Sequence, residues 1–226
     1  MSIGKFAAGV IVGWLLTQGV SVPSMAQQLT AYELVQDTTT KVMDVVVAAD
    51  AYVETDAERY YRQIQELLDP LIDYRGFARK VMGPYASSDR YRSMDEEGRQ
   101  KLKEQLDRFT EVMRASLVRT YSKGLLAFGG SRIELVPPDA EAGTSVVSLR
   151  QLIHADRQQP YVVMYQMGRE DSGEWKLSNV IIESVNLGEV YRDQFLASAR
   201  EQDGNLDTVI ENWSTVVVDV DKEAEK

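Results

Sequence analysis

The sequence of 226 residues contains no cysteine and a single histidine, His154. The lack of cysteine excludes disulfide bonds, thiolate metal ligands and a cysteine nucleophile. A catalytic triad has only one imidazole to use, and no serine lies in the setting of a nucleophile elbow. The acidic residues are scattered and do not cluster at the spacing that metal ligands need. We therefore expect no metal site and no enzymatic activity.

Positive charge is also in short supply, because 25 lysines and arginines face 35 acidic residues and give a net charge of −10. Nucleic acids and anionic membrane surfaces would repel such a chain at long range. We therefore expect no nucleic-acid partner.

One apolar run, Phe6 to Leu16, stands at the N-terminus and is broken only by glycines. A short start with one lysine precedes it, and Ser24-Met25-Ala26 places small residues where a signal peptidase reads. Residues 1–26 are predicted to be a signal peptide that is cut before Gln27, which makes the rest an exported protein of net charge −11. The alternative is an uncleaved N-terminal anchor. No later segment approaches the length of a membrane span.

Helical spacing dominates residues 30–128, where apolar residues recur at steps of three and four. Thr30, Thr55 and Ser93 each stand three residues before a glutamate, which is the pattern of a capping box at a helix start. The longest helix is predicted to follow Ser93. The segment from Ser87 to Met94 looks like a loop.

Alternation and β-branched residues then indicate strands, and residues 187–213 return to helical spacing. The expected strands are residues 131–136, 145–153, 161–167 and 175–185. This order predicts an α+β fold with one twisted antiparallel sheet of about four strands and helices packed against it. A single domain is expected over residues 27–218, followed by a charged tail at 219–226.

The predicted strands carry apolar residues on both faces, unlike a sheet that is half exposed to water. In the last strand, alternation places Trp175, Leu177, Ile181 and Val185 on one face. Both faces must therefore be covered. The cover is either a thick core of the protein's own side chains or, in part, a ligand.

Four segments resemble the MlaC family of periplasmic phospholipid-binding proteins, also called toluene-tolerance proteins. They are Val81-Met82-Gly83-Pro84-Tyr85, the helical run from Phe109 to Tyr121, the strand region from Gly173 to Leu187, and Tyr191-Arg192 with Phe195. The resemblance extends over nearly all of the chain after the leader, from about Ala31 to Trp213.

Three positions depart from the family pattern. Ala86 follows Tyr85 where the family often has an aromatic residue, Met113 stands where phenylalanine is usual, and Glu183-Ser184 replaces the usual Glu-Gly. These differences affect the shape of the loops and of the pocket more than the fold.

The resemblance implies a carrier that moves diacyl phospholipids between the outer and inner membranes of a Gram-negative envelope and maintains outer-membrane lipid asymmetry. The implied partners are an inner-membrane ABC transporter complex with its MCE-domain subunit and an outer-membrane lipoprotein. The carrier is expected to be a periplasmic monomer that needs no cofactor and binds phospholipid as cargo.

The resemblance also implies an apolar lipid cavity between the sheet and the long helix. Motif positions place Tyr121, Val162 and Val185 against the acyl chains, and helix periodicity adds residues beside Tyr121. The expected lipid-binding residues are Phe77, Val81, Phe109, Met113, Leu117, Tyr121, Leu125, Val162, Met164, Ile181 and Val185.

Two other classes of function stay open. An envelope adaptor or structural protein would use the same apolar residues as an ordinary packed core. A cell-wall hydrolase would use His154 with Asp156, or paired carboxylates among Asp69, Asp73, Asp89 and Asp95, for acid–base work on a glycan.

Overall fold

The computed structural model describes residues 29–139, 143–155 and 157–213. The predicted signal peptide and the charged tail lie outside these residues. The elements, in chain order, are α1 (Ala31–Ala49), α2 (Ala57–Leu68), α3 (Tyr74–Met82), the 3₁₀ helix η1 (Gly83–Ala86), α4 (Ser88–Ser93), α5 (Glu96–Leu126), β1 (Arg132–Val136), β2 (Val146–His154), β3 (Tyr161–Arg169), β4 (Trp175–Ile182), β5 (Val185–Asn186), α6 (Leu187–Glu201) and α7 (Leu206–Glu211).

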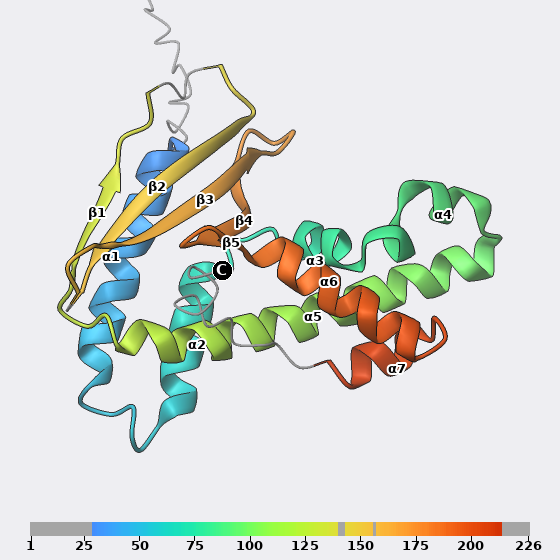
Figure 1. Ribbon diagram of the computed structural model, residues 1–226, viewed down its shortest axis with the longest axis horizontal. Helices are drawn as coiled ribbons and strands as arrows, with labels where there is room; N and C mark the ends of the chain where they lie inside the picture. Colours follow the sequence, from blue (N-terminus) through green and yellow to red (C-terminus); the bar gives the residue numbers. More distant parts are fainter. Residues whose placement is uncertain (1–28, 140–142, 156, 214–226) are drawn as a thin grey trace, which may run out of the picture.

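The described chain forms two lobes that share the long helix α5 (Figure 1). The sheet lobe consists of β1 to β5 with α1 and α2, and the helical arm consists of α3, η1, α4, α6 and α7 along the first part of α5. Helix α5 has 31 residues, which corresponds to a length of roughly 46 Å. The predicted α+β class is confirmed.

The sheet is antiparallel, with its strands in the order β1-β2-β3-β4-β5. It has five strands and not about four, because β5 turns back and pairs with the end of β4. The predicted strand over residues 175–185 is interrupted at Glu183 and Ser184, whose φ angles are 49° and 72°. Two consecutive residues with positive φ make the tight turn of a two-residue hairpin.

The two faces of the sheet have different surroundings. Directly paired residues share a face, so Leu149, Tyr165 and Met167 belong to one face, which packs against α1. We call this the inner face and the opposite one the outer face. In the view of Figure 1, α1 runs behind the strands.

The predicted alternation of β4 is wrong, because the strand contains a bulge. Gln166 pairs with Asn179 but Met167 pairs with Leu177, so one extra residue of β4 lies between the two pairs. The parity of the inner face therefore changes within the strand. Leu177 shares the inner face with Val180, while Ile181 lies on the outer face.

Helix starts follow the predicted capping logic, but with a shift at two of them. Thr30 caps α1 in a complete capping box, as predicted. The caps of α2 and α5 are Asp56 and Asp95, not Thr55 and Ser93. Each aspartate accepts a backbone N–H three residues further on, at 3.1 and 2.8 Å. A carboxylate accepts such a bond more strongly than a hydroxyl and also favours the positive end of the helix dipole.

The segment that was expected to be a loop contains α4. Ser87 precedes this short helix, and its side chain accepts the backbone N–H of Arg90 at 3.2 Å. Ser93 ends the same helix, and its hydroxyl donates to the Arg90 carbonyl at 2.8 Å. Ser93 thus ends α4, and the N-cap of α5 is Asp95, two residues further on.

Three apolar clusters form the core of the described residues. One fills the helical arm between α3, α5, α6 and α7, one lies between α1 and the inner face, and one joins α1, α2 and α5. Among the described helices, none has the length and apolar character required to cross a membrane.

Candidate functional site

Four of the predicted lipid-binding residues are core residues of the helical arm. Phe77 and Val81 of α3 and Phe109 and Met113 of α5 belong to one buried cluster, and the last three have 0% exposure. The ring of Phe109 lies 4.9 Å from that of Phe195 and 5.1 Å from that of Trp213, centroid to centroid. Other side chains of the protein therefore enclose these four residues.

On the same face of α5, the next two turns are less enclosed. Leu117 and Tyr121 are half-buried and pack against the same cluster, as do Val180 and Ile182 of β4. The helical arm and the sheet lobe thus meet in an apolar junction at this level of α5. Leu125, one turn further, packs against the cluster that joins α1, α2 and α5.

A pair of tyrosine hydroxyls lies at this junction. The hydroxyl oxygens of Tyr121 and Tyr191 are 2.7 Å apart and share a hydrogen bond. Burial raises the pKa of both phenols above the usual value of tyrosine. Both hydroxyls therefore stay protonated at neutral pH and place neutral polar groups in an apolar region.

Three of the four predicted residues on the strands lie away from this junction. Met164 pairs directly with Ile181, and Val162 stands two residues before Met164, so all three share the outer face. All three are half-buried. Val185 pairs with Ile182 and therefore belongs to the inner face, beside the junction.

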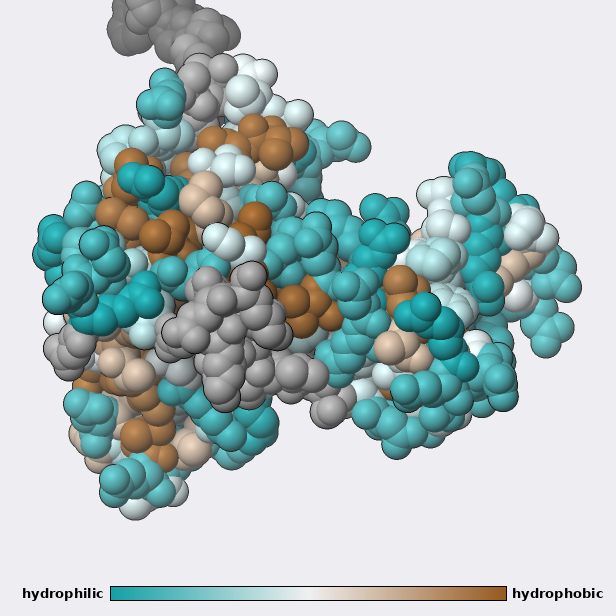
Figure 2. Space-filling view, in the orientation of Figure 1, coloured by the Kyte–Doolittle hydropathy of each residue, from teal (hydrophilic) through white to brown (hydrophobic). Residues whose placement is uncertain are grey.

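The eleven predicted residues thus fall into two sets by burial. Phe77, Val81, Phe109 and Met113 fill the arm. The half-buried ones retain accessible apolar surface at the junction, at the cluster that joins α1, α2 and α5, at the short β4–β5 hairpin and on the outer face; they are Leu117, Tyr121, Leu125, Val162, Met164, Ile181 and Val185. On the side shown in Figure 2, hydrophobic residues gather over the sheet lobe, while the arm is mostly hydrophilic.

A polar network between α1 and the inner face was not anticipated. The hydroxyl of Tyr165 donates to the Gln151 side-chain oxygen at 2.7 Å, and the Gln151 amide donates to the Thr39 hydroxyl at 3.0 Å. Gln151 is only 2% exposed, and burial raises the pKa of Tyr165. The signal in the sequence is a glutamine at a position of β2 that alternates with buried Leu149 and Ile153.

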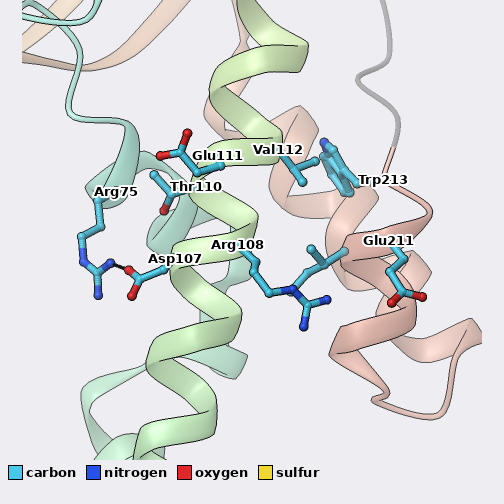
Figure 3. Close-up of a pocket in the computed structure, with 9 residues that line it drawn as sticks. Arg75, Asp107, Arg108, Thr110, Glu111, Val112, Glu211 and Trp213 are labelled. Atoms are coloured by element: carbon cyan, nitrogen blue, oxygen red, sulfur yellow. Dashed lines mark ion pairs between the residues drawn. The ribbon is translucent and has the colours of Figure 1, made fainter.

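An open groove of about 850 Å³ lies in the helical arm between α3, α5 and α7 (Figure 3). It is lined by Arg75, Asp107, Arg108, Thr110, Glu111, Val112, Ile210, Glu211 and Trp213. Most of these side chains are charged, and Arg75 of α3 forms an ion pair with Asp107 of α5. This groove lies away from the predicted cavity between the sheet and α5, and it contains none of the predicted lipid-binding residues.

The acids that suggested a hydrolase have structural partners. Asp73 caps α3, Asp95 caps α5, Asp69 forms an ion pair with Arg114, and Asp89 forms one with Arg92. No group of three or more potential metal ligands occurs within residues 29–139, 143–155 and 157–213.

His154 contacts Arg132 at 2.8 Å and lies 3.5 Å from a carboxylate oxygen of Glu134. The aspartate that was paired with it in the hydrolase hypothesis, Asp156, lies outside the described residues.

Comparisons with known proteins agree with this architecture. The model of the MlaC protein family matches residues 36–215. The toluene tolerance protein Ttg2D of Pseudomonas putida is 29% identical over 186 residues, which cover 82% of this chain and 80% of that protein. The crystal structure of a phospholipid-binding protein from Ralstonia solanacearum, in complex with a phospholipid, matches 88% of this chain and 100% of that one, with a TM-score of 0.65 and 16% identity. By the extent of the family match, this chain belongs to the MlaC family.

Proposed function

We propose that the protein is a periplasmic carrier that binds diacyl phospholipids and moves them across the aqueous space between two membranes. Membership of the MlaC family carries the proposal. The similar fold of the Ralstonia solanacearum protein, whose structure contains a phospholipid, supports it.

The half-buried apolar residues are the proposed contacts for the acyl chains. Leu117 and Tyr121 at the junction and Val162, Met164 and Ile181 on the outer face combine apolar surface with incomplete burial. The two regions lie on opposite faces of the sheet beside the β4–β5 hairpin, where the neighbouring residues Ile181 and Ile182 belong to the outer and the inner face. Met164 suits such a site, since an unbranched thioether repacks easily around ligands of different shape.

The energetics of acyl chains explain why a carrier is needed. Burying one CH₂ group is worth about 0.8 kcal/mol, so two sixteen-carbon chains resist exposure to water by roughly 24 kcal/mol. Transfer from a bilayer into an apolar protein site is nearly neutral, because both environments are hydrocarbon. Such a protein can receive and release lipid with small net free-energy changes, and its docking partners decide the direction.

The finer parts of the proposal follow the family. The carrier works between the outer and inner membranes and helps to maintain outer-membrane lipid asymmetry. It docks as a monomer on an inner-membrane ABC transporter complex with an MCE-domain subunit and on an outer-membrane lipoprotein. It has no catalytic role and needs no cofactor.

Native mass spectrometry of the protein purified gently from cells tests the carrier proposal. We expect species heavier than the polypeptide by the mass of one or more phospholipids, and lipid extraction should identify them. A polypeptide that carries no lipid after such a purification would contradict the proposal.

The second candidate is an envelope adaptor with an ordinary core, and the tight aromatic packing around Phe109 favours it. The variant Val162→Trp distinguishes the two. A carrier should remain folded and bind less lipid, because the indole occupies acyl-chain space. An adaptor that binds no lipid would show no change in lipid content and would keep its stability.

A further inference from the structure

An ion pair joins two loops at one end of the sheet. Arg157 lies between β2 and β3, and Glu183 lies in the β4–β5 hairpin. A terminal nitrogen of Arg157 donates to Glu183 Oε1 at 2.7 Å and to the Pro160 carbonyl at 3.0 Å. The guanidinium carbon of Arg157 also lies 3.5 Å from the centre of the Tyr161 ring. The cation is thus positioned by three separate groups.

Glu183 is also fixed by several hydrogen bonds. Its Oε1 accepts the backbone N–H of Val162 at 2.6 Å, and its own backbone N–H donates to the Val162 carbonyl at 2.9 Å. Glu183 and Ser184 adopt left-handed backbone conformations, which cost non-glycine residues on the order of 1 kcal/mol or more each. Strain of this kind persists where the surrounding contacts fix it, and it is often found at functional sites.

The pair is partly shielded from water by apolar neighbours. The side chains of Arg157 and Glu183 are 31% and 19% exposed. The Tyr161 ring that supports the guanidinium contacts Phe128 edge-on, with centroids 5.5 Å apart. Glu183 also stands in the hairpin that links Ile182 to Val185, next to Val162, so the pair borders the proposed acyl-chain contacts.

We propose that Arg157 and Glu183 form a headgroup site that favours zwitterionic aminophospholipids, an inference that rests on the proposed carrier function. The planar guanidinium suits a phosphodiester oxygen, and the carboxylate of Glu183 suits the ammonium group of the same lipid. An anionic headgroup without an ammonium group brings its phosphate beside the Glu183 carboxylate and offers that carboxylate no cationic partner.

Competitive loading tests this site. Purified protein is incubated with vesicles that contain equal amounts of phosphatidylethanolamine and phosphatidylglycerol, and the bound lipids are then extracted and quantified by mass spectrometry. We expect the unaltered protein to bind more phosphatidylethanolamine. Glu183→Gln should lower the ratio of bound phosphatidylethanolamine to bound phosphatidylglycerol about threefold to fivefold, which is the effect expected of one partly exposed charge. Arg157→Gln should lower the total amount of bound lipid.

Matched controls come from the opposite end of the sheet. Arg169 lies over the Trp175 ring at 5.6 Å, and Glu174, in the turn between β3 and β4, accepts the Ser172 hydroxyl at 3.3 Å. Arg169→Gln and Glu174→Gln remove the same charges away from the proposed site, so both should keep the ratio and the total of the unaltered protein.

If Glu183→Gln does not fold, Arg157→Lys serves instead, because it keeps the charge but not the planar fork. It should bind less total lipid than the unaltered protein. Equal loading of both lipids by the unaltered protein, with the same ratio and total in the folded variants, would show that the pair is only a structural clasp. An unaltered protein that binds no lipid at all would overturn the carrier function itself.

Discussion

The helical arm and the sheet lobe use the same kinds of apolar residue in different ways. In the arm, Phe109 and Met113 are fully enclosed by aromatic and aliphatic partners from α3, α6 and α7. On the outer face of the sheet, Met164 and Ile181 are paired through the backbone but remain half-buried. Two methionines of one chain thus have different surroundings.

This difference separates residues that hold the fold together from residues that keep accessible apolar surface. A fully packed side chain stabilises the protein through its contacts, and removal leaves a cavity. A half-buried apolar side chain stabilises less and can gain contacts when an acyl chain covers it. Burial in the structure therefore divides the eleven residues that the family resemblance put into a single group.

The largest expected effect is on stability and concerns the arm. Phe109→Ala should lower the free energy of unfolding by about 3–5 kcal/mol, because it opens a cavity between Phe195 and Trp213. Met164→Ala should lower it by about 1 kcal/mol or less, since its side chain is only half-buried. Denaturant titrations followed by circular dichroism measure both values. Equal losses in the two variants would contradict the contrast between the lobes.

Alkaline pH should affect both lobes, because each contains buried tyrosines. Burial raises the pKa of Tyr165 in the sheet lobe and of Tyr191 in the arm above the value of about 10 in the unfolded chain. The unfolded chain therefore releases these protons first, and stability should fall as the pH rises above about 10. The loss amounts to about 1.4 kcal/mol per pH unit for each such group.

Thermal unfolding between pH 8 and pH 11 checks this dependence. Tyr191→Phe removes one of the contributing groups, and its melting temperature should fall less steeply with pH than that of the unaltered protein. A melting temperature that does not change across this range would contradict the burial of the phenols.

The smallest effects concern the helix caps, where the two lobes should behave alike. Asp56→Ala in the sheet lobe and Asp95→Ala at the start of α5 should each cost about 1 kcal/mol of stability. Thr55→Ala and Ser93→Ala are the matched variants, because the capping-box pattern assigned the role to these residues, and each should cost less than its neighbour. Larger stability losses for Thr55→Ala and Ser93→Ala than for the aspartate variants would show that Thr55 and Ser93 are the caps, as the sequence pattern indicated.

The sequence is sufficient for the succession of a helical region, a strand region and a second helical region, and the reason is visible in α1. Its capping box at Thr30 and its apolar spacing both depend on local chemistry, and both are found where they were expected. The caps of α2 and α5 were displaced because acidic residues compete with the nearby hydroxyl, a choice that depends on small differences in hydrogen-bond strength.

The sequence predicted the candidate site less well than it predicted the fold. The bulge in β4 shifts the faces of the strand by one residue, so simple alternation joined Ile181 to residues of the opposite face. The positions of Arg157 and Glu183 depend on contacts between loops that lie 26 residues apart in the chain. Periodicity carries no information about such contacts, which only the folded chain brings together.

Photoreactive methionine incorporated throughout the protein tests the contrast between the lobes most directly. The protein is loaded with phospholipid, irradiated and digested, and the peptides that carry lipid are identified by mass spectrometry. Lipid adducts are expected on the peptide that contains Met164 and not on the one that contains Met113. Adducts confined to the Met113 peptide would show that the acyl chains enter the helical arm and would contradict the account.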